Sequence, residues 1–197
     1  MNESDPRDRY LAAAARVFAR RGYHGASLSQ VAAELDVTKQ ALLHFFPKKE
    51  ALYVATLARL SDRLVAQVRA AGGATGEARL TAFFEAYWDE SALRPDDARL
   101  VAFALLECEP EAEAWPLKPF LNALIGLAGQ TERWSMESPA ARLAGLYRLI
   151  AASHYFAIST TALSGMYGDG ELYKIAAAAR TEARRSLAVF LEPEPAD

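Results

Sequence analysis

The stretch of sequence that decides the fold is residues 27–50, which run SLSQVAAELDVTKQALLHFFPKKE. Ser27 is a favourable N-cap, and Gln30 three residues later completes the pattern of a capping box. A buried helix face at i, i+3, i+4, i+7 spacing is predicted from Leu28, Val31, Ala32 and Leu35. Asp36 then interrupts the helix, because Asp tolerates the left-handed backbone of a sharp turn better than most residues. The pattern predicts two short helices joined by a tight turn.

The second of these helices, which Thr38 can cap, has two chemically different sides. The side predicted to pack inward consists of Ala41, Leu42, Phe45 and Phe46. The opposite side consists of Lys39, Gln40, Leu43 and His44. A short helix with an apolar back and a cation, an amide and an imidazole on its front suits the major groove of DNA. The same spacing also fits a plain helical hairpin with a solvated polar face, so spacing alone leaves both interpretations open.

Composition restricts the protein to a globular class. The chain has 197 residues, of which 52% are hydrophobic and 24% charged, typical of one folded domain or two small ones. Its apolar runs fall short of the ~20 residues of a membrane span, and the polar N-terminus does not resemble a signal peptide. The single cysteine, Cys108, cannot form an internal disulfide. We therefore expect a cytoplasmic protein.

The net charge of −3 hides an uneven distribution. Residues 1–60 contain nine Lys and Arg against six Asp and Glu, whereas residues 61–197 contain thirteen against nineteen. From Arg16 to Lys49 there are six basic residues and two acidic ones. We call residues 1–60 the head and residues 61–197 the body. A basic head followed by an acidic body is expected when one end of a protein binds phosphate groups.

The rest of the chain is predicted to be helical, which gives an all-α fold of about nine helices. A first helix, about 6–21, has its C-terminus at Gly22. An acidic, proline-rich loop is expected at 108–119. Further helices are predicted from 47–50 to Gly72 and at about 77–92, 95–107, 117–134, 139–165 and 170–191.

Catalytic and cofactor motifs are not found in the sequence. The three histidines lack a His or carboxylate three or four residues away, as a helical metal site requires. The glycine-rich segment 72–76 lacks the Lys-Ser/Thr of a phosphate-binding loop. We expect no metal and no cofactor. A helical enzyme and a purely architectural DNA-binding protein remain open as alternative interpretations.

Over residues 10–52 the sequence resembles the TetR/AcrR family of transcriptional regulators. The residues that match the family pattern in order and spacing are Phe18, Gly22-Tyr23, Ser27-Leu28, Val31-Ala32, Val37, Thr38-Lys39, Leu42, His44-Phe45-Phe46 and Lys49-Glu50-Ala51-Leu52. Beyond residue 52 only the layout of helices matches. The resemblance implies a helix-turn-helix DNA-binding domain at 1–50 and a helical ligand-binding and dimerisation domain at 51–197.

Four positions depart from the family pattern. Asp36 replaces the frequent turn glycine, and Leu43 replaces a tyrosine on the outer side of the second helix. Phe45 lacks a frequent aromatic hydroxyl, and Lys48 stands where a serine cap is common. Leu43 therefore loses a hydrogen bond to DNA and gains possible contact with a thymine methyl group.

The resemblance and the side-chain chemistry together give a candidate DNA-binding set. Hydroxyl groups at helix N-termini suit phosphate, and Lys and Gln suit the edges of guanine and adenine. The candidates are Ser27, Thr38, Lys39, Gln40, Leu43, His44, Lys48 and Lys49.

The resemblance also implies a homodimer through the last two helices, a near-palindromic DNA operator, and repression relieved by a small-molecule effector bound in the body. An aromatic, sparsely charged lining favours a mostly apolar or aromatic effector. The candidate lining residues are Phe84, Tyr87, Trp88, Phe103, Trp115, Asn122, Trp134, His154 and Tyr155.

Overall fold

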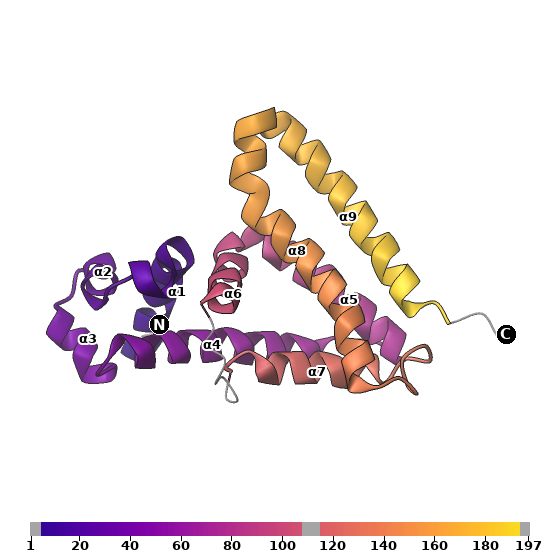
Figure 1. The fold of residues 1–197 in the computed structure, drawn as a ribbon, viewed down its shortest axis with the longest axis horizontal. Helices are drawn as coiled ribbons and strands as arrows, with labels where there is room; N and C mark the ends of the chain where they lie inside the picture. The colour runs from indigo at the N-terminus through magenta and orange to yellow at the C-terminus, as the bar shows by residue number, and fades with distance from the viewer. Residues whose placement is uncertain (1–4, 108–114, 194–197) are drawn as a thin grey trace. The chain divides into compact units, whose positions relative to one another are not determined.

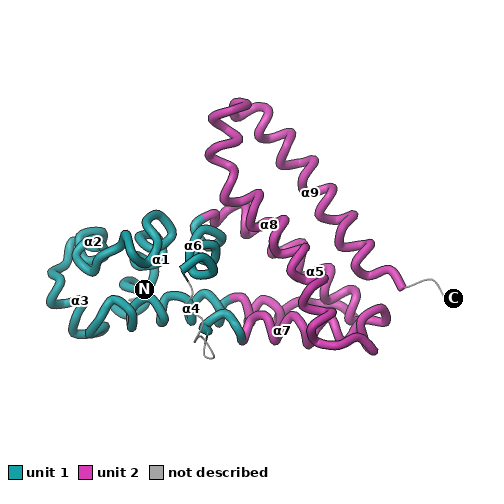
Figure 2. Tube along the Cα trace, in the orientation of Figure 1, with its two compact units in different colours: residues 1–63, 96–118 teal, residues 64–95, 119–197 magenta. Residues whose placement is uncertain are grey.

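The computed structural model describes residues 5–107 and 115–193, and every regular element in these ranges is an α-helix. Two compact units make up the chain, residues 1–63 with 96–118 and residues 64–95 with 119–197 (Figure 2). The helices, labelled as in Figure 1, are α1 (Pro6–Gly25), α2 (Leu28–Glu34), α3 (Lys39–Phe45), α4 (Lys49–Ala70), α5 (Gly76–Leu93), α6 (Pro95–Leu106), α7 (Lys118–Ala128), α8 (Pro139–Tyr167) and α9 (Asp169–Leu191).

The first unit is built around the apolar faces of α1, α2 and α3. Phe18 of α1 is 1% exposed and Val31 of α2 is fully buried, as their helical spacing predicted. Leu42 of α3 and Phe46 directly after it are also buried. These side chains hold three short helices together, and α4 begins immediately after them at Lys49.

Helix α6 belongs to this first unit because it packs on the end of α1. Gly22 has φ of +67°, a conformation that favours glycine, and it interrupts the helical backbone as predicted. A Cβ atom at Gly22 would lie 2.5 Å from a carboxylate oxygen of Glu107 and 2.9 Å from the ring of Phe103. The same carboxylate accepts a 2.7 Å hydrogen bond from the backbone nitrogen of Tyr23. Glycine at position 22 therefore permits both the break in α1 and the close approach of α6.

The second unit contains the long antiparallel pair α8 and α9 (Figure 1), with α5 packed against both. Ser138 caps α8 through a 3.2 Å hydrogen bond from the backbone nitrogen of Ala141, and Pro139 occupies the first turn. Helix α8 continues through Gly165 to Tyr167, and Gly168, with φ of +82°, is its C-cap. The helix is thus two residues longer than the spacing predicted.

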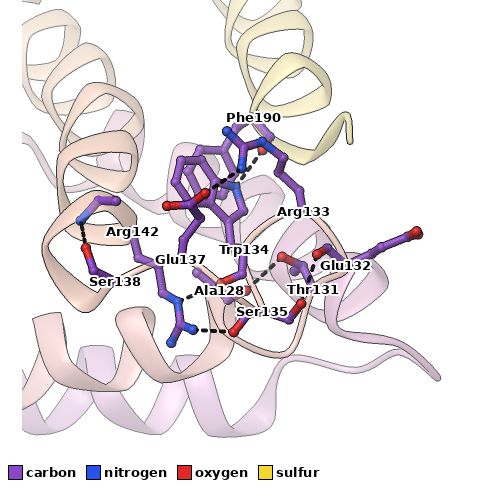
Figure 3. A network of polar contacts seen from close by, with 11 residues as sticks. Ala128, Thr131, Glu132, Arg133, Trp134, Ser135, Glu137, Ser138, Arg142 and Phe190 are labelled. Carbon is purple, nitrogen blue, oxygen red and sulfur yellow. Dashed lines mark hydrogen bonds and ion pairs between the residues drawn. The ribbon is translucent and has the colours of Figure 1, made fainter. Parts of the chain in front are cut away.

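The prediction of one helix over about 117–134 is wrong, since α7 ends at Ala128 and residues 129–137 form turns. Thr131 donates its side-chain hydroxyl to the backbone oxygen of Ala128 at 2.7 Å. Trp134 donates from Nε1 to the backbone oxygen of Phe190 at 2.7 Å and stacks on the Phe190 ring (Figure 3). Arg142 of α8 donates to the backbone oxygens of Trp134 and Ser135. Contacts both within the segment and to Phe190, 56 residues away, thus hold these residues in turns.

Cys108 and most of the predicted acidic loop lie outside the described residues. Within 5–107 and 115–193, no helix combines the length and the apolar character needed to cross a membrane.

Candidate nucleic-acid interface and ligand pocket

The helix-turn-helix has the local geometry that its sequence predicted. Ser27 Oγ accepts from the backbone nitrogen of Gln30 at 3.2 Å, while Gln30 Oε1 accepts from the backbone nitrogen of Ser27 at 2.9 Å, so the capping box is complete. Asp36 adopts the left-handed conformation, with φ of +54°. The turn between α2 and α3 is therefore made by Asp where a glycine would be less strained.

Helix α3 separates its two sides as expected. Leu42 and Phe46 are buried, and Phe45 is half-buried with its ring centre 5.1 Å from that of Tyr10. On the other side Lys39, Gln40 and His44 are exposed, and Leu43 is half-buried. The core fixes one side of α3 and leaves the polar side accessible to a ligand.

The side-chain hydroxyls of Ser27 and Thr38, which cap α2 and α3, can also act as hydrogen-bond donors. Thr38 Oγ1 accepts from the backbone nitrogen of Ala41 at 3.2 Å, which matches the role of Ser27 Oγ in α2. A hydroxyl that accepts in a cap keeps its own proton to donate. Both residues are exposed, so each can cap its helix and donate to a phosphate oxygen.

The two lysines at the start of α4 have different surroundings. Lys48 is exposed and forms a 2.6 Å ion pair with Glu50, and this hydrogen bond raises the pKa of Lys48. Lys49 is half-buried, and its Nζ donates to the backbone oxygens of Tyr23 at 2.8 Å and Ala26 at 3.2 Å. Lys49 therefore has a structural role in the first unit, in addition to any contact that it makes with phosphate.

Positive charge on α1 is partly neutralised within the first unit. Arg16 and Arg20 both donate to the carboxylate of Glu34 at the end of α2, at 2.7 and 2.5 Å. The hydrogen bond from Arg16, with that from Arg20, lowers the pKa of Glu34. These pairs fasten α2 to α1 and leave Lys39 and Lys48 as exposed cations close to the outer side of α3.

In the second unit a pocket lies between α5, α8 and α9. Three predicted lining residues, Phe84, Tyr87 and Trp88, do line it. His154 is adjacent, because the Tyr87 hydroxyl lies 2.5 Å from His154 Nε2. Burial lowers the pKa of His154 to about 4, so the imidazole is neutral near pH 7. In the tautomer with its proton on Nδ1, His154 Nε2 accepts a hydrogen bond from the Tyr87 hydroxyl.

The other predicted lining residues do not join this pocket. Phe103 lies against Gly22 in the first unit, to which Trp115 also belongs. Trp134 stacks on Phe190 with 4.6 Å between ring centres. Asn122 is exposed, and Tyr155 is 73% exposed.

Several polar residues of the pocket were not predicted from the sequence. Ser153 is 3% exposed, and its hydroxyl has no hydrogen-bond partner among the described residues. Arg184 of α9 forms two hydrogen bonds with the carboxylate of Glu85 in α5, at 2.6 and 2.8 Å. Arg180 bridges Glu85 and Asp89. These residues are distant in sequence and carry no local motif.

Comparison with known proteins concerns mainly the head. The sequence profile of the bacterial regulatory proteins of the tetR family matches residues 11–56. The HTH-type transcriptional regulator RutR of Escherichia coli is 43% identical over 60 residues, which are 30% of this chain and 28% of RutR. The HTH-type transcriptional activator FasR of Mycolicibacterium smegmatis is 41% identical over 85 residues, 42% of this chain and 39% of FasR. Residues 11–56 thus match the DNA-binding segment of the bacterial regulatory proteins of the tetR family.

Solved structures extend the likeness to the whole TetR fold. A TetR transcriptional regulator from Legionella pneumophila superposes with a TM-score of 0.68 at 18% identity, covering 94% of this chain and 99% of that one. The fatty acid degradation regulator FadR of Bacillus halodurans gives a TM-score of 0.67 at 18% identity, covering 91% and 97%. These similarities show that this chain shares the helical fold of those two proteins.

The aligned segments cover less than half of RutR and of FasR, and both proteins are transcription regulators.

Proposed function

We propose that the protein is a dimeric transcriptional regulator that binds a near-palindromic DNA operator through the outer side of α3. The observation that carries the proposal is the division of α3, with Leu42 fully buried while Lys39 and Gln40 are exposed. Lys39 can donate to guanine O6 and N7, and Gln40 can pair with adenine N6 and N7. Ser27, Thr38, Lys48 and Lys49 would contact phosphate, and Leu43 and His44 would complete the surface.

The dimer would form through α8 and α9. These two helices expose large apolar side chains, including Tyr155 at 73%, Tyr173 at 79% and Met166 at 65%. Burying such residues against a second copy removes apolar surface from water. Two heads would then meet two half-sites about 34–36 Å apart, which is one turn of DNA.

A small-molecule effector would bind in the second unit and lower the affinity for the operator. The pocket of Phe84, Tyr87 and Trp88 supports this part of the proposal, because ligand sites are mostly apolar with a few polar groups. We propose repression as the default output and chromosomal DNA in the cytoplasm as the target. FasR is named as an activator, so a reporter assay must establish the sign.

Selection of bound sequences from random DNA tests the proposal. Purified protein should enrich one near-palindromic site, and sedimentation of the complex should give two chains per duplex. Binding with little sequence preference would favour an architectural DNA-binding protein instead. Addition of a metabolite pool to the selected complex tests release by an effector.

A further inference from the structure

We infer that the α5–α8–α9 pocket takes a small, mostly apolar carboxylic acid, whose carboxylate replaces Glu85 on Arg184. The inference rests on the proposed function, because it names the chemical class of the effector for the same body. Three observations carry it. The wall of the pocket is mostly apolar, the buried Ser153 hydroxyl has no hydrogen-bond partner among the described residues, and Arg180 and Arg184 form part of the pocket rim.

The wall of the pocket selects for an apolar ligand body. Phe84 is 8% exposed and Leu187 of α9 is 5% exposed, and both line the pocket beside Trp88 and Leu149. Trp88 is held in place by a stacked Phe156 ring, 5.8 Å away between centres. A strongly polar molecule would lose its hydration here without compensation.

Within this apolar wall, Ser153 supplies one polar group that the protein leaves unsatisfied. Its hydroxyl is buried and has no hydrogen-bond partner within 5–107 and 115–193. A buried hydroxyl without a partner is costly and uncommon in folded proteins. A ligand oxygen or N–H group would satisfy it, so Ser153 points to a molecule with a hydrogen-bonding group near its apolar part.

The rim explains why the ligand should be an anion. As it stands, the pocket offers about 30 Å³ to the centres of water molecules, enough for about two or three waters. A larger ligand that parts α5 from α9 would break the contact between Glu85 and Arg184, which joins these two helices. A ligand carboxylate restores the two parallel hydrogen bonds of the Arg184 guanidinium, whereas a neutral ligand leaves Arg184 without a carboxylate partner while Glu85 keeps its contact with Arg180.

The local charges agree with this choice. Arg180 and Arg184 share the single carboxylate of Glu85 on the pocket lining, and Arg180 also reaches Asp89. When a ligand carboxylate takes Arg184, Glu85 keeps Arg180 as its partner, so no carboxylate of the protein is left without a cation. A ligand carboxylate competes directly with Glu85 for Arg184.

The test measures binding of 3-phenylpropionate and octanoate, with their neutral amides as matched probes, by calorimetry on the DNA-free protein. Both carboxylates should bind more tightly than their amides. Arg184→Gln should weaken carboxylate binding by about tenfold or more, and Glu85→Gln should strengthen it by up to about fivefold because a competitor is lost. Arg185→Gln is the matched control, since Arg185 pairs with Glu182 within α9 and its loss should leave binding unchanged.

Ser153→Ala provides a second, independent readout. The substitution removes an unsatisfied buried hydroxyl, so the apoprotein should melt at an equal or higher temperature while carboxylate binding weakens. Equal binding of acids and amides, equal effects of Glu85→Gln and Arg184→Gln, or no binding of either acid would overturn the inference. Operator binding is measured separately without these probes, so its failure would instead overturn the proposed function.

Discussion

The side-chain nitrogen of Lys49 donates a 2.8 Å hydrogen bond to the backbone oxygen of Tyr23 and lies 4.2 Å from the centre of the Tyr23 ring. The same nitrogen also donates to the backbone oxygen of Ala26 at 3.2 Å. The first turn of α4 is thereby fastened to the segment that joins α1 to α2. An ammonium group has three protons, so one remains for a phosphate oxygen.

The two lysines should consequently respond differently to substitution. Lys49→Ala leaves two backbone oxygens without their donor, and we expect a loss of about 1–3 kcal/mol in unfolding free energy together with weaker operator binding. Lys48→Ala should leave the unfolding free energy unchanged and reduce the slope of log K against log salt by about one unit. Chemical denaturation and salt-dependent anisotropy measure the two effects. An unchanged slope for Lys48→Ala would exclude Lys48 from phosphate contact.

Gly22→Ala should destabilise the first unit. Its φ of +67° disfavours any side chain, and the new Cβ would meet the Glu107 carboxylate. We expect a loss of about 1–3 kcal/mol by thermal or denaturant unfolding. Gly165→Ala in α8 is the matched control, since nothing lies within 4 Å of its Cβ position, and it should stabilise by about 0.5–1 kcal/mol. Similar stability in both variants would refute the steric role of Gly22.

Features set by neighbouring residues could be predicted from the sequence. The capping box of Ser27 and Gln30, the left-handed Asp36 and the two sides of α3 depend on contacts three or four residues apart. Features set by distant residues could not. Gly129 gives a local signal for the end of α7, but the contact of Trp134 with Phe190, 56 residues away, has no local pattern.

The candidate sites divide in the same way. Every predicted DNA-binding residue lies on or beside the helix-turn-helix, since that motif is continuous in sequence. Of the predicted lining residues, only Phe84, Tyr87 and Trp88 line the pocket. Aromatic character alone does not reveal which side of a helix meets which neighbour, and the Glu85–Arg184 pair joins residues 99 positions apart.

His154 should make stability depend on pH. Its pKa in the folded protein is about 4, against an ordinary value of 6.5, because burial disfavours the charged form. The unfolded chain therefore takes up a proton first, so the contribution to stability is complete above pH 6.5 and is lost as pH falls toward 4. At pH 5 the loss should be about 1–2 kcal/mol.

Denaturant unfolding across this pH range provides the check. His154→Gln keeps an acceptor for the Tyr87 hydroxyl without titrating, so its stability should depend less on pH between 7 and 5. An identical profile for wild type and His154→Gln would remove His154 as the cause.

A charge on α8 should disrupt the proposed dimer. Tyr155→Glu places a carboxylate where a 73% exposed aromatic ring is proposed to meet a second copy, and a charge buried without a partner is strongly unfavourable. Sedimentation should show monomer at concentrations where the wild type is dimeric. Leu93→Glu at the end of α5, where the side chain is 81% exposed, should remain dimeric. Equal sedimentation of both variants would count against an interface at Tyr155.

The most direct measurement is the base preference of Gln40→Ala at every position of the selected operator, compared with the wild type. Because one Gln40 faces each half-site in a dimer, we expect Gln40→Ala to lose its base preference at two positions related by the symmetry of the site. The loss of binding free energy should be about 1–3 kcal/mol at each position. A uniform loss of affinity over all operator sequences, or a change at only one position, would contradict this prediction.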